Sequence, residues 1–119
     1  TVVDAAGEAL QRKDEWIVRY RETSPDLAGV TTTLVLSRER IAVLRGGAVR
    51  AEQRFAAGRT LAGRYETSYG AFALETRTFR LSVRLGVAAA EAEWAYELFI
   101  GGAAAGTFFA VLHVQEAEA

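Results

Sequence analysis

A chain of 119 residues, half of them apolar, is long enough for a single folded domain, which we expect to span residues 1–119. Its 14 basic and 15 acidic residues nearly cancel, which argues against nucleic-acid binding, because that requires an excess of positive charge. The absence of cysteine excludes disulfides, thiol nucleophiles and cysteine-ligated metals. We expect a cytoplasmic protein without membrane contact, because the sequence shows neither a signal-peptide pattern nor an apolar run approaching ~20 residues.

The N-terminal half of the chain shows the patterns of short strands. Residues 4–13 include helix-forming residues, but Gly7 weakens a helix there, and we expect a strand. Apolar and polar residues then alternate over 16–22 and 31–36, which is typical of half-buried strands. The pair Gly46-Gly47 predicts a two-residue hairpin turn, because both central positions of such a turn favour positive φ.

The second half of the chain contains a change of register. Phe72 and Leu74 lie at even positions, whereas the apolar residues of 79–85 lie at odd positions. If one face is to remain inward, an extra residue must be inserted, so we expect a β-bulge near 76–78, where the strand would turn a corner. Residues 87–95 are expected to form a loop that leads into a strand. Strands spaced about every ten residues, with turn residues between them, predict an all-β sandwich or barrel.

Several short motifs occur in order along nearly the whole chain. They are Tyr20-x-Glu22, Thr31-Thr32-Thr33, Arg45-x-Gly47-Ala48-Val49, Gln53-Arg54-Phe55, Tyr65-x-Thr67-x-Tyr69-Gly70, Leu74-x-Thr76-x-Thr78 and Tyr96-x-Leu98. In this set the chain resembles the YwiB-like proteins, small bacterial β-barrels grouped with the calycins and named as a domain of unknown function. The resemblance implies a single small antiparallel calycin/lipocalin-like barrel of about eight strands, with no activity assigned. It also implies one more strand before Thr1, whose absence would expose a sheet edge.

One set of polar residues comes from strands that a barrel would bring together. Glu22 shares a strand face with Trp16, Val18 and Tyr20, and an inward carboxylate needs a partner because an unpaired buried charge is costly. Arg45 is the partner that we expect. The candidate ligand-binding or structural polar network consists of Tyr20, Glu22, Arg45, Tyr65, Thr67 and Tyr69. Such a set fits a polar anchor in a ligand cavity. It fits better a structural network that fixes strand register.

Catalytic and metal-binding chemistry has little support in the sequence. The single histidine, His113, lies between apolar residues, and no metalloprotease, nucleophile-elbow or P-loop pattern occurs. The carboxylates of Glu22, Glu66 and Glu75 could in principle pair for glycoside hydrolysis, but nothing in their spacing brings them together. We therefore expect no catalytic residue, no metal and no cofactor, and rank an enzyme last among the possible functions.

Two other functions remain open. The first is a barrel that binds a small apolar or amphipathic ligand, although many bulky residues fall at inward positions: Trp16, Tyr20, Phe72, Phe79, Leu81, Trp94, Tyr96 and Phe108. The second is an interaction module that forms a homo-oligomer, a homodimer or larger, through an outer sheet face or an open edge. Residues 2–10 contain no proline or lysine to protect such an edge, and 108–114 are strongly apolar. Alternating charges at 50–54 and 64–66 predict cross-strand ion pairs on a solvated face.

Overall fold

The computed structural model describes residues 6–116, and within them period-two alternation produces a single sheet of nine antiparallel strands. The strands are β1 (Gly7–Arg12), β2 (Glu15–Arg21), β3 (Val30–Ser37), β4 (Arg40–Gly47), β5 (Arg50–Ala56), β6 (Thr60–Thr67), β7 (Gly70–Leu85), β8 (Ala89–Ile100) and β9 (Ala103–Gln115). A single 3-10 turn, η1 (Pro25–Leu27), lies between β2 and β3. The predicted all-β antiparallel class is confirmed, with nine strands rather than about eight.

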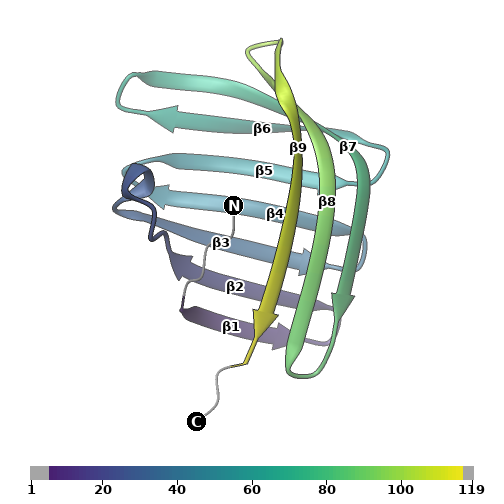
Figure 1. The fold of residues 1–119 in the computed structure, drawn as a ribbon. Helices are drawn as coiled ribbons and strands as arrows, with labels where there is room; N and C mark the ends of the chain where they lie inside the picture. Colours follow the sequence, from purple (N-terminus) through teal and green to yellow (C-terminus); the bar gives the residue numbers. More distant parts are fainter. Residues whose placement is uncertain (1–5, 117–119) are drawn as a thin grey trace.

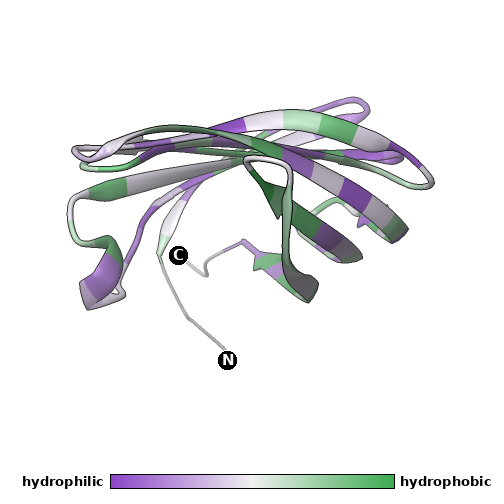
Figure 2. Cartoon of the chain, turned by 90° about the horizontal axis from the view of Figure 1, so that it is seen from above, coloured by the Kyte–Doolittle hydropathy of each residue, from purple (hydrophilic) through white to green (hydrophobic). Residues whose placement is uncertain are grey.

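The sheet curls on itself as a half-barrel. Each strand is hydrogen-bonded to the next along the chain, from β1 to β9, and the first and last strands are not paired with each other. In Figure 1 the strands β1 to β6 lie side by side, while β8 and β9 cross over the face of β2 to β5. Seen from above, the sheet is arched, and its strands alternate between hydrophobic and hydrophilic residues (Figure 2). The curl gives the sheet a concave face, which encloses the core, and a convex face.

The long strand β7 turns the corner of the half-barrel at a bulge. Thr78 is opposite Tyr96 and Arg80 is opposite Ala95, so Phe79 is the extra residue. The bulge moves the buried positions from even to odd numbers, as the sequence predicted, one residue beyond the expected site. Phe79 itself is exposed, so its expected inward position was wrong: at the bulge, two consecutive side chains, Phe79 and Arg80, face solvent.

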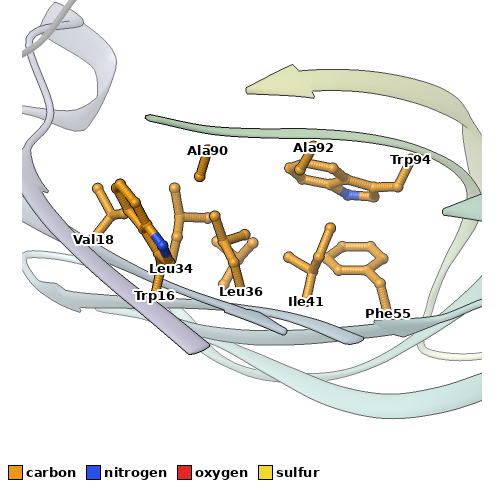
Figure 3. Close-up of a cluster of buried hydrophobic side chains, with 10 residues drawn as sticks. Trp16, Val18, Leu34, Leu36, Ile41, Phe55, Ala90, Ala92 and Trp94 are labelled. Atoms are coloured by element: carbon orange, nitrogen blue, oxygen red, sulfur yellow. The ribbon is translucent and has the colours of Figure 1, made fainter. Parts of the chain in front are cut away.

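Ten buried residues form the hydrophobic core, which we call the core end of the concave face. They are Trp16, Val18, Leu34, Leu36, Ile41, Val43, Phe55, Ala90, Ala92 and Trp94. Figure 3 shows the side chains of β8 pointing toward those of β2 to β5 across the space between the two layers. The small side chains of Ala90 and Ala92 on β8 let that strand approach the large residues opposite. This packing closes one end of the half-barrel.

The glycine pair near residue 46 has a different role from the one predicted. Gly46 and Gly47 are the last residues of β4, and the chain reverses at Ala48 and Val49. Gly47 does have the predicted positive φ, 114°. Its predicted place in a two-residue turn was wrong, because the turn lies at residues 48 and 49. Glycine is needed at position 47 because a Cβ there would clash with the carbonyl oxygen of Gly29.

The two uncertain segments are strands. The segment expected at 4–13 forms β1 over Gly7–Arg12, which confirms a strand against a helix, and positions 1–5 lie outside the described residues. The loop expected from residue 87 is short, because β8 begins at Ala89. No helix among residues 6–116 is long and apolar enough to cross a membrane.

Charged residues on the convex face lie in complementary register. Glu52 is opposite Arg64, and Arg50 is opposite Glu66, as expected for cross-strand pairs. The ion pairs, however, form between residues of the same strand and not across strands. Arg54 Nη1 lies 3.4 Å from Glu52 Oε2, and Arg64 Nη2 lies 2.7 Å from Glu66 Oε1. Exposed pairs of this kind add little stability, and they make the convex face over β5 and β6 a charged, solvated surface.

Candidate functional site

A polar network lies on the concave face where β2, β3 and β4 meet. Tyr20 is opposite Thr32, and Thr32 is opposite Arg45, so the three side chains project from the same face. Glu22 follows β2, and its backbone N–H donates to the carbonyl oxygen of Val30, at 2.9 Å. The Thr32 hydroxyl donates to Glu22 Oε1 at 2.5 Å, and Arg45 Nε lies 3.8 Å from the same oxygen. The Glu22 side chain is only 7% exposed, so the carboxylate is held inside this network.

Two tyrosine hydroxyls belong to the same electrostatic environment. Burial raises the pKa of Tyr20, and the charge and hydrogen bonding of Glu22 raise it further, while Arg45 opposes the shift. Burial also raises the pKa of Tyr96, on β8, while the charge of Arg45 and a hydrogen bond with Gln53 oppose the shift. Both phenols are therefore neutral at physiological pH and can donate or accept hydrogen bonds.

Three buried polar atoms have no hydrogen-bond partner among residues 6–116. They are Arg45 Nε, Thr78 Oγ1 and Trp94 Nε1. Thr78 is opposite Tyr96 in the sheet, and Trp94 lies on the same face of β8 as Tyr96. A buried donor without a partner costs about 1–3 kcal/mol, and most such atoms in folded proteins are paired. The concave face thus has unused hydrogen-bonding capacity around Tyr96.

Beyond Tyr96 the concave face is apolar and only partly covered. We call this region the open end, and it consists of Tyr65, Phe72, Leu98, Ile100 and Phe108. Its aromatic part begins at Phe108, which is opposite Tyr96 and stacks on it with ring centroids 5.5 Å apart. Phe72, Ile100 and Phe108 are 44%, 39% and 43% exposed. The polar network and the open end are therefore adjoining parts of one surface.

The register explains why these apolar residues are continuous. Leu74, which is buried, is opposite Ile100, and Phe72 is the next residue on the same face of β7. Phe72 is in turn opposite Tyr65 on β6. Alternate residues of a strand share a face, so Leu98 connects Ile100 to the Tyr96 region along β8. The result is a largely apolar surface from β6 to β9, in which Thr76, opposite Leu98, is buried and donates its hydroxyl to the carbonyl oxygen of Arg54.

The structure brings together three of the six predicted network residues. Tyr20, Glu22 and Arg45 are in contact range, through Thr32. Tyr65 lies on the same cross-strand row as Arg45, two strands away through Ala51, or about 10 Å at the usual strand spacing. It therefore belongs to the open end rather than to the polar network.

The other two predicted residues lie outside the network. Thr67 ends β6, and its hydroxyl oxygen accepts a hydrogen bond from the backbone N–H of Tyr69, at 3.1 Å. Tyr69 is 95% exposed, because it lies in the turn between β6 and β7 and its side chain projects away from the sheet. Sequence reasoning grouped both residues with Tyr65 by their common motif and could not place the end of the strand.

Sequence reasoning also missed members of the site. Thr32, Gln53 and Tyr96 each lie in one of the short motifs, but the predicted network included none of them. The inward position of Thr32 could have been predicted from the sequence, because Thr32 alternates in step with the apolar residues Leu34 and Leu36, which are buried. The contribution of Tyr96 depends on the crossing of β8 over the first strands, which no local pattern reports.

The carboxylates and the histidine considered in the sequence analysis do not gather at this site. Glu66 and Glu75 project from the convex face, opposite to Glu22, so the three carboxylates do not converge. Residues 6–116 contain no group of three or more His, Asp or Glu side chains that could hold a metal ion. His113 is exposed, with Nδ1 3.5 Å from Glu91 Oε1 on the convex side. A shallow hollow of about 430 Å³ lies on the convex face, over β2, β3 and β4. It is lined by Arg19, Gly29, Thr31, Thr33, Leu44, Arg45, Gly46 and Gly47.

Comparison with known proteins identifies relatives with the same fold. The chain is 32% identical over 76 residues to the uncharacterized beta-barrel protein YwiB of Bacillus subtilis (strain 168), an alignment that covers 64% of this chain and 54% of that protein. The chain thus spans about half the length of the curated relative that it matches. The crystal structure of the ywiB protein from Bacillus subtilis has a TM-score of 0.76, with 24% sequence identity, over 93% of this chain and 75% of that chain.

The structural likeness shows that the two proteins share a barrel fold. The family of this chain is shown by its sequence. Residues 1–110 match the family described as "Domain of unknown function (DUF1934)". This match covers all of the motifs, every strand up to β8 and the first part of β9. The chain therefore belongs to the DUF1934 family, an uncharacterised family that includes β-barrel proteins resembling YwiB.

Proposed function

We propose that the half-barrel binds a small amphipathic molecule on its concave face. The observation that carries this proposal is the continuity of two surfaces: the partly exposed apolar residues of the open end adjoin buried polar atoms that lack partners. Ligand sites in proteins combine a mainly apolar concave lining with a few convergent polar groups. The apolar body of the ligand would cover Phe72, Ile100 and Phe108, and its polar head would lie beside Arg45 and Tyr96.

The charges of the network favour a head group without net charge. Arg45 and Glu22 neutralise one another at 3.8 Å, and the two nearby phenols are uncharged at physiological pH. The free Nε of Arg45 needs an acceptor, and the hydroxyls of Tyr20 and Tyr96 can serve as donor or acceptor. A hydroxyl, carbonyl or amide group satisfies these partners without adding an unpaired charge to a half-buried site.

The size of the ligand is limited by the core end. Phe55 and Trp94 fill the space between the layers, with ring centroids 5.7 Å apart, and Tyr96 packs on Phe55 at 4.6 Å. The bulk predicted from the sequence is therefore real at this end, so the ligand does not enter the whole barrel. It lies against the open end, where the same kinds of residue are only partly covered.

Two adjacent phenylalanines on β9 provide a matched test. Phe108 belongs to the open end, whereas Phe109 projects from the convex face. We would titrate the purified protein with 1-aminoanthracene, a small apolar fluorophore with one neutral polar group, and record native mass spectra for bound small molecules. Phe108→Lys should weaken probe binding at least tenfold, while Phe109→Lys should change it less than twofold. Circular dichroism would verify that both variants are folded.

The results separate the possible interpretations clearly. Equal losses in both variants, or no saturable binding in the unmodified protein, would exclude the concave site. If Arg45→Met also weakens the probe, the polar head lies at the network. If Phe108→Lys alone does so, the binding is apolar only, and the assignment of the head group to the network is wrong.

A further inference from the structure

The last strand of the sheet, β9, has an unpaired edge. β9 covers Ala103–Gln115, 13 residues, and is hydrogen-bonded to β8 on one side. Among residues 6–116 no strand pairs with its other side, because β1 does not close the barrel. A strand edge of this length presents a row of unpaired backbone donors and acceptors, which is a template for another strand.

The register of β9 with β8 shifts at Ala105, and beyond this irregularity the edge of β9 lacks the charges and prolines that protect the edges of soluble sheets. Its 13 residues contain no Lys, Arg, Asp, Glu or Pro, and His113 is the only one that can carry charge. The opposite edge strand, β1, is six residues long and carries Glu8 and Arg12. Charged side chains and short strands are common means of blocking edge-to-edge pairing. The two edges of this sheet therefore differ, and only β9 is suited to pairing.

We propose that two copies of this chain pair through their β9 edges, antiparallel about a two-fold axis, to form one continuous sheet. An antiparallel pair of identical strands satisfies the same donors and acceptors in each copy, so the contact is self-complementary and closed. The lengths match, and no like charges meet along the paired edges. Pairing of β9 with β1 of another copy would combine strands of unequal length in a head-to-tail contact that does not close.

The convex side chains of β9 add to this pairing. Phe109 and Val111 are both exposed large apolar residues, next to one another on the convex face. In a register centred on Ala110, Phe109 faces Val111 of the partner subunit, and the same contact is repeated by symmetry. Aromatic and β-branched residues in directly opposite positions form favourable cross-strand pairs.

Single charge substitutions on the two edges test the proposal. Val111 and Leu10 project from the convex face of β9 and β1, and about half of each side chain is exposed. We would measure the mass by light scattering from about 5 to 200 µM, because contacts of one strand pair are weak. The unmodified protein should reach twice the 12.9 kDa of one chain. Val111→Lys should raise the dissociation constant at least tenfold, while Leu10→Lys should leave it within twofold.

A cysteine placed at the centre of the pair gives an independent readout. The chain contains no cysteine, so Ala110→Cys introduces a single thiol, with Ala9→Cys on β1 as its matched control. A short bis-maleimide should join two Ala110→Cys chains and not two Ala9→Cys chains. A mass of one chain at 200 µM would overturn the proposal. So would a dimer that Val111→Lys leaves intact, or one that is lost only in Leu10→Lys, which would assign the contact to β1 instead.

Discussion

Phe55 and Phe108 make a direct comparison between the two ends of the concave face. Both rings pack on Tyr96, with centroids 4.6 Å and 5.5 Å away. Phe55 is 1% exposed and belongs to the core end, whereas Phe108 is 43% exposed and belongs to the open end. The same residue type, touching the same neighbour, thus contributes to the core at one position and to an accessible surface at the other. The difference arises because the layers meet over β2 to β5 and not over the strands that follow.

This comparison predicts unequal effects on stability. Phe55→Ala should lower the free energy of unfolding by about 3–5 kcal/mol, because it leaves a cavity among buried residues. Phe108→Ala should lower it by only about 1 kcal/mol, because much of its ring is already in water. Urea denaturation of both variants would measure the two values. Similar losses would mean that the open end is as tightly packed as the core end, which would remove the basis for a ligand there.

Gly46 and Gly47, next to Arg45 at the end of β4, provide a second pair of matched variants. Gly47→Val should destabilise the fold by roughly 1–3 kcal/mol from the strained backbone alone, and the clash with the Gly29 carbonyl adds to this. Gly46→Val is the matched control, because Gly46 lacks a positive φ and a Cβ there would meet nothing within 4 Å. Thermal unfolding should separate the two variants by several degrees. Equal melting temperatures would show that β3 and β4 adjust freely at this position.

The ion pair in the polar network has a smaller expected effect. Glu22 is buried, but Arg45 is 31% exposed and its Nε lies 3.8 Å away, so this is not a fully desolvated pair. We expect a coupling of about 1 kcal/mol between Glu22→Gln and Arg45→Met in a double-mutant cycle of unfolding free energies. Thr32→Val should weaken this coupling, since its hydroxyl donates to the same carboxylate oxygen. A coupling near zero would contradict an electrostatic role for the pair.

The sequence predicted the parts of this fold that depend on local alternation. The parity change predicted between Leu74 and Phe79 located the bulge within one residue, because one inserted residue must switch the buried face. The pairing of Glu22 with Arg45 followed from a carboxylate on an apolar strand face. Crossing of β8 over β2 to β5 is a long-range property, so the sequence did not reveal the role of Tyr96 or the incomplete covering of Phe72 and Phe108. The turn at Tyr69 was missed because the motif pattern continues beyond the end of β6.

The titration of Tyr20 gives the smallest effect, and it tests whether the network is buried as described. Burial and Glu22 raise the pKa of Tyr20 above its usual value near 10, whereas the unfolded chain keeps that usual value. Above pH 10 the unfolded state therefore binds fewer protons than the folded state, so the free energy of unfolding falls as pH rises. The stabilising contribution is complete below pH 10 and disappears as pH passes through the folded pKa.

Tyr20→Phe removes this titration and should make the fall in stability between pH 9 and 11 shallower. Burial raises the pKa of Tyr96 as well, so part of the fall should persist in that variant. Tyr69→Phe is the matched control, because this tyrosine is 95% exposed and lies outside the network. Guanidinium denaturation at half-unit pH steps would give the slopes. Identical slopes in Tyr20→Phe and the unmodified protein would mean that the Tyr20 hydroxyl is solvated, and the polar network would then lie outside the enclosed part of the concave face.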